Sequence, residues 1–201
     1  MRSLISAQLK LEASISMPKT WRDLSDKDTS TNIYQQNVIP SAVLVPLIER
    51  SMGIRIILTR RSKYLKSHGG QISFPGGRME KEDISPAHTA LRETQEEIGI
   101  DTDAVEIIGC LDNYSIVTTG FRITPLVGFV NPTQKFKRNE SEVESIFEIP
   151  LTVVMNKKNY HKESRTIKDV NYSYQVLPYE EHRIWGATAA ILLNLCNLLS
   201  K

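Results

Sequence analysis

Three glutamates stand close together in a segment that has the signals of a helix. Glu93, Glu96 and Glu97 lie within five consecutive positions, so a helix, at about 100° per residue, brings them to one side. Carboxylates at this spacing destabilise an isolated helix by roughly a few tenths of a kcal/mol per pair. A hard divalent cation removes this conflict, because Mg²⁺ and Mn²⁺ prefer oxygen ligands. The alternative is an acidic surface exposed to water, where Arg92 pairs with Glu96.

The helix that positions these glutamates is marked at both ends. Ser85 is a suitable N-cap, Pro86 suits the first helical position, and Gly99 suits the left-handed position that ends a helix. The side opposite the glutamates carries small or apolar residues: Ala87, Ala90, Leu91, Thr94 and Ile98. We therefore expect one face of the helix to pack against the protein and the other to present three carboxylates.

Two adjacent glycines precede the helix. Gly76 and Gly77 follow Phe74 and Pro75, after a strand-like run. Adjacent glycines let the backbone turn sharply and approach a helix or a ligand closely. We therefore expect this segment to form a loop that enters the helix.

Together, the loop and the helix resemble the Nudix box. The sequence from residue 76 to residue 100 reads GGRMEKEDISPAHTALRETQEEIGI. The usual box is a Gly, five residues, a Glu, seven residues, Arg-Glu, a variable pair, Glu-Glu, one residue and a Gly. The matching positions are Gly77, Arg92, Glu93, Glu96, Glu97 and Gly99. Asp83 replaces the first Glu and is separated from Arg92 by eight residues rather than seven, and Thr94 replaces an aliphatic residue.

The resemblance implies a metal site on the helix and a particular fold. It implies that Glu96 is the central ligand of Mg²⁺ or Mn²⁺, and that Glu93 and Glu97 complete the site, directly or through water. It also implies that Arg92 orients Glu93 by a charge-assisted hydrogen bond. We place Asp83 behind the ligands rather than among them. The fold implied is α/β (α+β), with an α/β/α sandwich around a mixed β-sheet.

The residues upstream resemble a further motif, found in the coenzyme A diphosphatases of the Nudix superfamily. That motif is commonly written LLTxR(S/A)xxxRxxxGxxxFPGG, and residues 57 to 77 read ILTRRSKYLKSHGGQISFPGG. The resemblance extends from about residue 40 to residue 195, and residues 184 to 189 are similar to the closing helix of this subgroup. The residues that we expect to bind substrate are Arg60, Lys66, Gly70, Gly76 and Gly77.

The charge of the chain is nearly balanced overall but not locally. The formal net charge is +2, from 25 Lys and Arg against 23 Asp and Glu, which argues against a protein that wraps nucleic acid. Residues 51 to 79 contain six basic side chains and no acidic one, whereas residues 80 to 97 contain six acidic and two basic ones. The basic run suits the phosphates of a coenzyme A-like substrate beside an acidic metal site. The alternative is ordinary surface charge.

The predicted reaction is metal-dependent hydrolysis of the phosphoanhydride of coenzyme A or its derivatives, which gives 3′,5′-ADP and 4′-phosphopantetheine or its acyl form. One alternative is a Nudix diphosphatase that acts on ADP-ribose, dinucleotide polyphosphates or nucleoside triphosphates. Another is a non-catalytic Nudix-like nucleotide sensor, but retention of all three glutamates argues against it. For the general base we prefer Glu142 over Glu144, because apolar residues follow and could anchor it. His68 is a candidate for a phosphate or base contact.

The chain divides into an N-terminal appendage of short helices and loop, residues 1 to 37, and a Nudix domain, residues 38 to 201. The appendage has weakly amphipathic stretches at 4–13 and 21–24. Strand-like runs occupy 42–48, 54–59, 105–111, 123–130 and 172–177. Residues 156 to 168 are basic and predict a loop or exposed hairpin, which either binds an anion or is simply solvated. Residues 184 to 199 predict a packed terminal helix.

Cysteine usage and the N-terminus favour a cytoplasmic protein. Cys110 and Cys196 lie far apart and form no CxxC pair, so neither a disulfide framework nor a thiolate zinc site is indicated. No signal peptide is visible. We expect a small-molecule substrate, with neither nucleic acid nor membrane as a partner, and residues 1 to 37 are a candidate surface for a homodimer. Tyr179 and Trp185 are assigned to packing.

Overall fold

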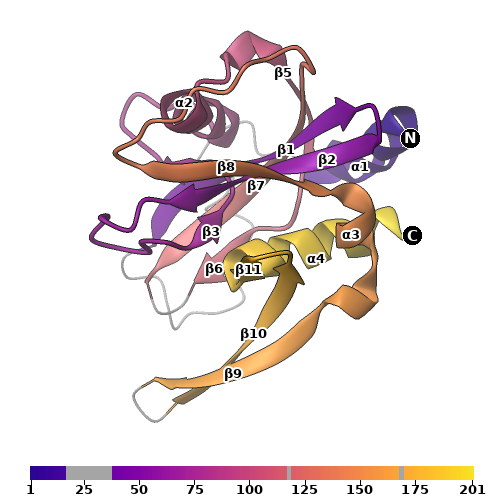
Figure 1. Cartoon of the computed structure of the whole chain (residues 1–201). Coiled ribbons are helices and arrows are strands. Elements are labelled where there is room, and N and C mark those ends of the chain that lie inside the picture. Colours follow the sequence, from indigo (N-terminus) through magenta and orange to yellow (C-terminus); the bar gives the residue numbers. More distant parts are fainter. Residues whose placement is uncertain (17–37, 117–118, 168–169) are drawn as a thin grey trace.

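The structure is a computed structural model that describes residues 1–16, 38–116, 119–167 and 170–201 (Figure 1). The amphipathic stretch expected at residues 21–24 lies outside the described residues. Within the described part, Cys110 and Cys196 are buried and form no disulfide. None of the helices described is both long enough and apolar enough to cross a membrane.

The main sheet has eight strands and is mixed. Its strands are β1 (Ile39–Arg50), β2 (Gly53–Arg61), β3 (Ile72–Ser73), β4 (Gly76–Arg78), β5 (Val105–Cys110), β6 (Tyr114–Ile116), β7 (Phe121–Val130) and β8 (Val143–Pro150). The order is β3-β2-β1-β7-β5, while β4, β6 and β8 pair with β1, β7 and β2. Among the described strands, only β1 and β7 pair in parallel, from Ile39 opposite Phe121 to Ile48 opposite Val130. The expected mixed sheet is therefore confirmed.

Helices cover both faces of this sheet, which confirms the expected sandwich (Figure 1). The helices are α1 (Arg2–Ser16), α2 (Pro86–Ile98), α3 (Leu151–Met155) and α4 (Ala187–Leu199). Side chains of β1 alternate between two cores: Leu44 packs with Ala90 of α2, whereas Leu47 packs with Leu9 of α1 and Leu192 of α4. A strand buried on both faces reads as a near-continuous apolar run, as β1 does.

Helix α1 packs onto the body of the protein rather than standing apart from it. Ile5 and Leu9 belong to the larger core. Arg2 forms an ion pair of 2.6 Å with Glu106 of β5, and the Gln8 amide donates to the carbonyl of Leu198 in α4 at 2.9 Å. The domain boundary expected at residue 37 stays a prediction, but residues 2–9 contribute to the same core as the sheet.

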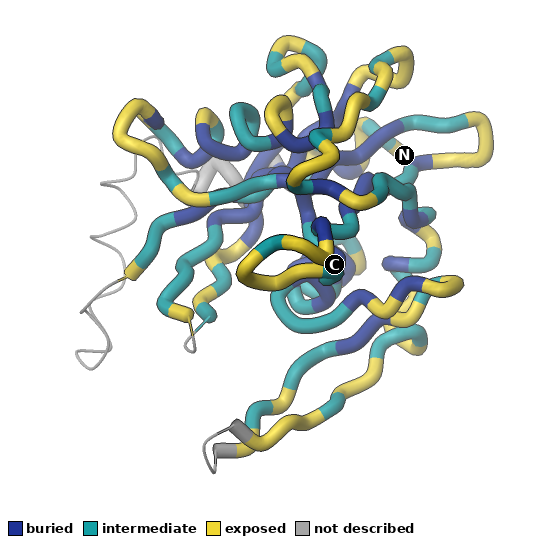
Figure 2. The backbone as a smooth tube through the Cα atoms, turned by 60° about the vertical axis from the view of Figure 1, so that its left-hand side comes forward, coloured by how far each residue is buried: buried dark blue, intermediate teal, exposed yellow. Residues whose placement is uncertain are grey.

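A second, antiparallel sheet projects from the body (Figures 1 and 2). It contains β9 (His161–Ile167), β10 (Val170–Tyr179) and β11 (His182–Trp185). The basic segment predicted as a loop or exposed hairpin thus forms a short 3₁₀ turn, Lys157–Asn159, and strand β9 of a hairpin. The prediction that a single helix covers residues 184 to 199 is wrong at its start. Ile184 and Trp185 belong to β11, and Gly186, at φ +65°, separates them from α4.

The glycine pair forms a strand rather than the expected loop. Gly76 and Gly77 lie in β4, opposite Val43 and Ala42 of β1. At Gly76, φ is +149°, and a Cβ atom would lie 2.4 Å from the Ala42 carbonyl oxygen and 2.5 Å from the Val43 Cα. Both neighbours are backbone atoms of a central strand, which cannot move aside without disturbing the sheet. Close pairing of β4 with β1 therefore requires glycine at this position.

We predict that Gly76→Ala destabilises the fold more than Gly53→Ala does. Both glycines have positive φ, but a Cβ atom at Gly53 meets nothing within 4 Å. Backbone strain is thus common to both variants, while only Gly76→Ala adds overlap with β1, at a further cost of about 2 kcal/mol. Urea unfolding followed by circular dichroism measures both free energies. Equal losses in the two variants would show that β4 does not press on β1 as described.

Candidate active site

The helix α2 has the ends predicted for it. The Ser85 side chain accepts a hydrogen bond from the His88 amide at 3.1 Å, and Pro86 is the first helical residue. Gly99 has φ +68°, and its amide donates to the carbonyl of Gln95 at 2.9 Å. These caps fix where the helix begins and ends, and so they fix which side chains point toward β4.

The expectation that all three glutamates share an open face is wrong for Glu97. Its side chain is only 3% exposed, whereas that of Glu96 is 54% exposed and Glu93 lies between them at 16%. The residues of α2 that are buried include Thr94, Glu97 and Ile98. The packed face of α2 is therefore wider than its apolar residues alone indicate, and it includes the carboxylate of Glu97.

A cleft of about 990 Å³ runs along the side of the main sheet and reaches the second sheet. Three carboxylates line one part of it: Glu93, Glu97 and Glu142. Its cationic side chains are Arg61, Arg78 and Arg165. Its aromatic side chains are Phe74, Tyr114, Phe121, Tyr172, Tyr174 and Trp185. A smaller hollow of about 370 Å³ beside Arg2 contains none of the residues predicted for the site.

Burial makes the carboxylate end of the cleft electrostatically unfavourable. It raises the pKa of Glu97 to about 8, an effect that Arg61, 3.4 Å away, only partly opposes and that the charges of Glu93 and Glu142 reinforce. Burial also raises the pKa of Glu93, and Arg92 opposes it. Arg61 and Arg92 therefore offset only part of the cost of burying the charges of Glu97 and Glu93.

This donor set fits a hard divalent cation. Within the residues that the structure describes, no three His, Cys, Asp or Glu side chains already form a ready-made metal-binding group. The ligand roles of Glu93, Glu96 and Glu97 thus stay a prediction. The chemistry of the site is nevertheless suitable, because a cation would offset the burial of negative charge on Glu93 and Glu97, and oxygen is the donor that Mg²⁺ and Mn²⁺ prefer.

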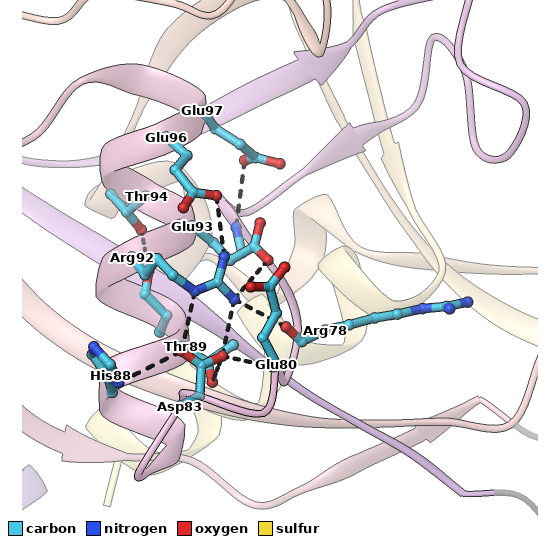
Figure 3. Close-up of polar contacts among 12 residues, drawn as sticks. Arg78, Glu80, Asp83, His88, Thr89, Arg92, Glu93, Thr94, Glu96 and Glu97 are labelled. Carbon is cyan, nitrogen blue, oxygen red and sulfur yellow. Dashed lines mark hydrogen bonds and ion pairs between the residues drawn. The ribbon is translucent and has the colours of Figure 1, made fainter.

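Arg92 lies at the centre of a network that holds the glutamates (Figure 3). Its guanidinium donates to both carboxylate oxygens of Asp83, at 3.1 and 2.9 Å. It also contacts Glu93 and Glu96, each at 3.1 Å, and the carbonyl of Arg78 at 3.2 Å. Arg92 therefore lies where the sequence analysis expects it, beside Glu93.

Asp83 anchors this arginine from the end of the longer loop. Its side chain is fully buried and accepts hydrogen bonds of 2.8 Å from both the Thr89 hydroxyl and the Glu80 amide. Burial by itself raises the pKa of Asp83, but the hydrogen bonds from Arg92, Glu80 and Thr89 outweigh it and lower the pKa to about 2. This placement agrees with a position behind the proposed ligands.

The absence of a side chain at Gly77 makes room for Glu93. A Cβ atom built at Gly77 would lie 2.4–2.5 Å from the carboxylate atoms of Glu93. The neighbouring amide of Gly76 points to the Glu97 carboxylate at 3.4 Å. The two glycines predicted to bind substrate therefore line the cleft and also determine how closely the glutamates approach β4.

Glu142 joins the α2 glutamates from a different part of the chain. It lies in the turn before β8, where its backbone carbonyl accepts from the Ser62 amide at 2.7 Å and its carboxylate accepts from the Asn139 amide group at 3.1 Å. The next residue, Val143, is buried and anchors the turn. Glu144, the alternative base, is exposed and does not line the cleft. The structure thus places Glu142, and not Glu144, beside Glu93 and Glu97.

Three other residues predicted to bind substrate do not line the cleft. Arg60 contacts His182 of β11 at 3.0 Å, and Lys66 is exposed on the β2–β3 loop. Gly70 shapes that loop with φ +72°. The cleft receives Arg61 instead, because adjacent side chains of a strand point to opposite faces. Counted along the upstream motif, the first Arg also falls on position 61, so the sequence held the signal that the assignment missed.

Sequence analysis also missed most of the aromatic lining. Trp185, assigned to packing, lines the cleft, whereas Tyr179 packs on the core as expected. Arg165 and Tyr172 also line the cleft. Arg165 belongs to the basic segment for which a loop or exposed hairpin, with or without a bound anion, is expected, and Tyr172 begins the expected strand-like run 172–177. His68 lines the cleft with φ +59°, and its Nδ1 lies 3.0 Å from the Gln71 side chain. A left-handed conformation at a non-glycine residue is a signal available only from coordinates.

The sequence has clear relatives. The profile of the NUDIX domain matches residues 38–170. The protein named "Uncharacterized Nudix hydrolase NudL" from Citrobacter koseri is 38% identical over 155 residues, which cover 77% of this chain and 80% of the relative. The protein of the same name from Escherichia coli K12 is 37% identical over the same shares of the two chains.

Solved structures of similar fold have much lower sequence identity. A MutT/nudix family protein from Enterococcus faecalis superposes with a TM-score of 0.52 at 13% identity, covering 96% of this chain and 73% of that one. A NUDIX hydrolase from Alicyclobacillus acidocaldarius gives a TM-score of 0.51 at 17% identity, covering 83% and 97% of the two chains. At these identities the likeness concerns the fold alone.

We predict that Asp83→Asn lowers the free energy of unfolding by about 2–3 kcal/mol at pH 7. The pKa of Asp83 is about 2 in the folded protein and about 3.9 when unfolded, and each unit corresponds to about 1.36 kcal/mol. Because the folded pKa is the lower one, this stabilisation is complete above about pH 4 and is lost as the pH falls toward 2. Urea unfolding at pH 7 and at pH 3 measures it. The neighbouring Glu82→Gln, at an exposed position, is the control, and a loss that is independent of pH would contradict the assignment.

Proposed function

The chain belongs to the Nudix hydrolase family and cleaves phosphoanhydrides, and from that premise we propose that its substrate is coenzyme A or one of its derivatives. The products would be 3′,5′-ADP and 4′-phosphopantetheine, or its acyl form. The observation that carries this proposal is the single cleft, which joins buried carboxylates, three arginines and an aromatic wall. Such a cleft matches a substrate with a phosphoanhydride, a further phosphate and a flat base.

Mg²⁺ or Mn²⁺ would be held at the carboxylate end of the cleft. Glu93 and Glu97 line that end. Glu96 lies one helical turn from Arg92 and forms an ion pair with it. When bound, such an ion neutralises charge on the phosphoryl oxygens and lowers the pKa of water. Arg92, which Asp83 anchors, orients the Glu93 carboxylate toward this end of the cleft.

The remaining steps fall to side chains of this chain. Arg61 and Arg78, which both line the cleft, bind phosphate oxygens. Glu142 accepts a proton from a water molecule as its oxygen attacks one phosphorus atom of the phosphoanhydride. The bridging P–O bond breaks, and the leaving phosphate keeps its electron pair. The reaction therefore adds one water across one bond and needs neither a covalent intermediate nor a redox partner.

The alternatives differ in what they require of the cleft. ADP-ribose, dinucleotide polyphosphates and nucleoside triphosphates share the phosphoanhydride with coenzyme A but lack its 3′-phosphate. The upstream motif and the three arginines favour coenzyme A, because a second phosphate group needs its own cation. A non-catalytic sensor would have no use for three glutamates beside Glu142. A homodimer through residues 1–37 and a cytoplasmic location stay predictions.

We predict that the purified protein with Mg²⁺ or Mn²⁺ turns over coenzyme A with a higher kcat/KM than ADP-ribose, diadenosine polyphosphates or nucleoside triphosphates. Mass spectrometry should identify 3′,5′-ADP and 4′-phosphopantetheine. EDTA should abolish turnover, because the phosphoryl oxygens lose their neutralising charge.

Glu96→Gln provides the control for this assay, since the resemblance makes Glu96 the central ligand. This variant should lose most of the activity in the same preparation. Preferred turnover of ADP-ribose would refute the substrate while leaving phosphoanhydride hydrolysis intact. Unchanged turnover by Glu96→Gln would refute the metal assignment instead.

We predict that Glu142→Gln lowers kcat by about a hundredfold or more with little change in KM, because general-base catalysis typically contributes about 10²–10⁴ in rate. Glu144→Gln is the matched control, since it removes the same charge two residues away at a position outside the cleft. Steady-state kinetics on coenzyme A separates the two parameters. Similar kcat values for the two variants would show that the base is another group.

A further inference from the structure

The second sheet supplies one wall of the cleft. Arg165 of β9, Tyr172 and Tyr174 of β10, and Trp185 of β11 all line it. Their positions follow from the register: Arg165 lies opposite Tyr172, and Trp185 lies opposite Val176, which is two residues from Tyr174. Because alternate residues of a strand share a face, these side chains stand on the same side of the hairpin. Figure 1 shows the three strands side by side, and residues up to twenty positions apart along the chain thus line the cleft together.

The aromatic part of this wall is held in place by its own contacts. The rings of Tyr174 and Trp185 are 5.4 Å apart and tilted by 58°. The Arg183 guanidinium lies 5.9 Å from the first ring and 5.6 Å from the second. Glu163 binds Arg183 and accepts from the Tyr174 hydroxyl at 3.3 Å. A flat base that stacks here would meet a surface that is already ordered.

Unlike Arg61 and Arg183, Arg165 has no hydrogen-bond or ion-pair partner among the described residues. Arg61 is paired with Glu97, and Arg183 is paired with Glu163. Glu163, the acid that shares a strand face with Arg165, is engaged by Arg183, His161 and Tyr174. Arg165 therefore presents to the cleft, beside the aromatic rings, a guanidinium that no described side chain engages.

The chemistry of this wall suits only one half of the proposed substrate. The pantetheine half is a neutral amide chain, which offers a guanidinium no negative charge to pair with. The nucleotide half carries a flat purine and, on its ribose, a phosphate whose oxygens match the forked donors of Arg. Of the two residues that the upstream motif offers for that phosphate, Arg61 lines the cleft but is paired with Glu97, and Lys66 does not line it.

We propose that the second sheet selects the substrate: Arg165 of the β9–β10 hairpin binds the 3′-phosphate of the nucleotide, while the purine stacks against Tyr174 of β10 and Trp185 of β11. This inference rests on the proposed function, because it assigns the nucleotide half of the same substrate to one wall of the same cleft. Arg165 acts in binding and takes no part in the bond-breaking step.

The test compares coenzyme A with dephospho-coenzyme A, which lacks only the 3′-phosphate. Arg165→Gln should raise KM for coenzyme A by about tenfold to a hundredfold, as expected for loss of one charged hydrogen-bonding pair. It should leave kcat, and both parameters for dephospho-coenzyme A, unchanged. Lys162→Gln is the matched control, because it removes a positive charge from β9 at an exposed position outside the cleft. Equal effects of Arg165→Gln on the two substrates, or equal effects of the two variants, would overturn the proposal.

A binding measurement separates this proposal from the reaction itself. Calorimetric titration of the protein with 3′,5′-ADP and with 5′-AMP needs no turnover. The unmodified chain should bind 3′,5′-ADP more tightly, and Arg165→Gln should abolish that preference. If coenzyme A is not hydrolysed but the preference is present and depends on Arg165, the substrate proposal fails and the hairpin proposal stands. If the chain has no preference for 3′,5′-ADP, the hairpin proposal fails whatever the assay of hydrolysis shows.

Discussion

The geometry of the site depends on how closely the Glu93 side chain of α2 approaches the backbone of β4. The Glu93 carboxylate occupies the space that a Cβ atom of Gly77 would fill, and Gly76 in turn lets β4 pair closely with β1. These contacts set the distance between α2 and the sheet, and that distance decides which carboxylates are buried. Burial of Glu97 and partial burial of Glu93 follow from it, and with them the need for positive charge at this end of the cleft.

Ion pairs within the site balance part of the opposite charges of the basic and acidic runs. The basic and acidic runs of the sequence meet in space, where Arg61 pairs with Glu97 and Arg92 is shared by Asp83, Glu93 and Glu96. Asp83 is the acid that pairs with Arg92 from a fully buried position. The glutamates contact the outer edge of the same guanidinium, which orients them without neutralising all of them.

The sequence was most informative where a single residue type determines local structure. Ser85, Pro86 and Gly99 defined α2 because capping depends on one residue at each position. It was least informative where partners are distant along the chain. The residues of β4 read as a loop because their pairing depends on β1, and the place of Trp185 in the cleft depends on neighbours that come from β10. The buried position of Glu97 also could not be predicted, since the helical pattern shows which residues share a face but not how far the sheet reaches around it.

The two sheets differ in what a change to each would alter. The described strands of the main sheet pack against α2, which carries three of the glutamates, and those of the second sheet pair only among themselves. The hairpin can therefore lengthen, shorten or change its side chains without shifting the register of β1, β4 or β7. Substitutions confined to the projecting β9–β10 hairpin, whether by evolution or by design, could therefore change which molecules such an enzyme accepts. The residues that act on the phosphoanhydride would stay the same.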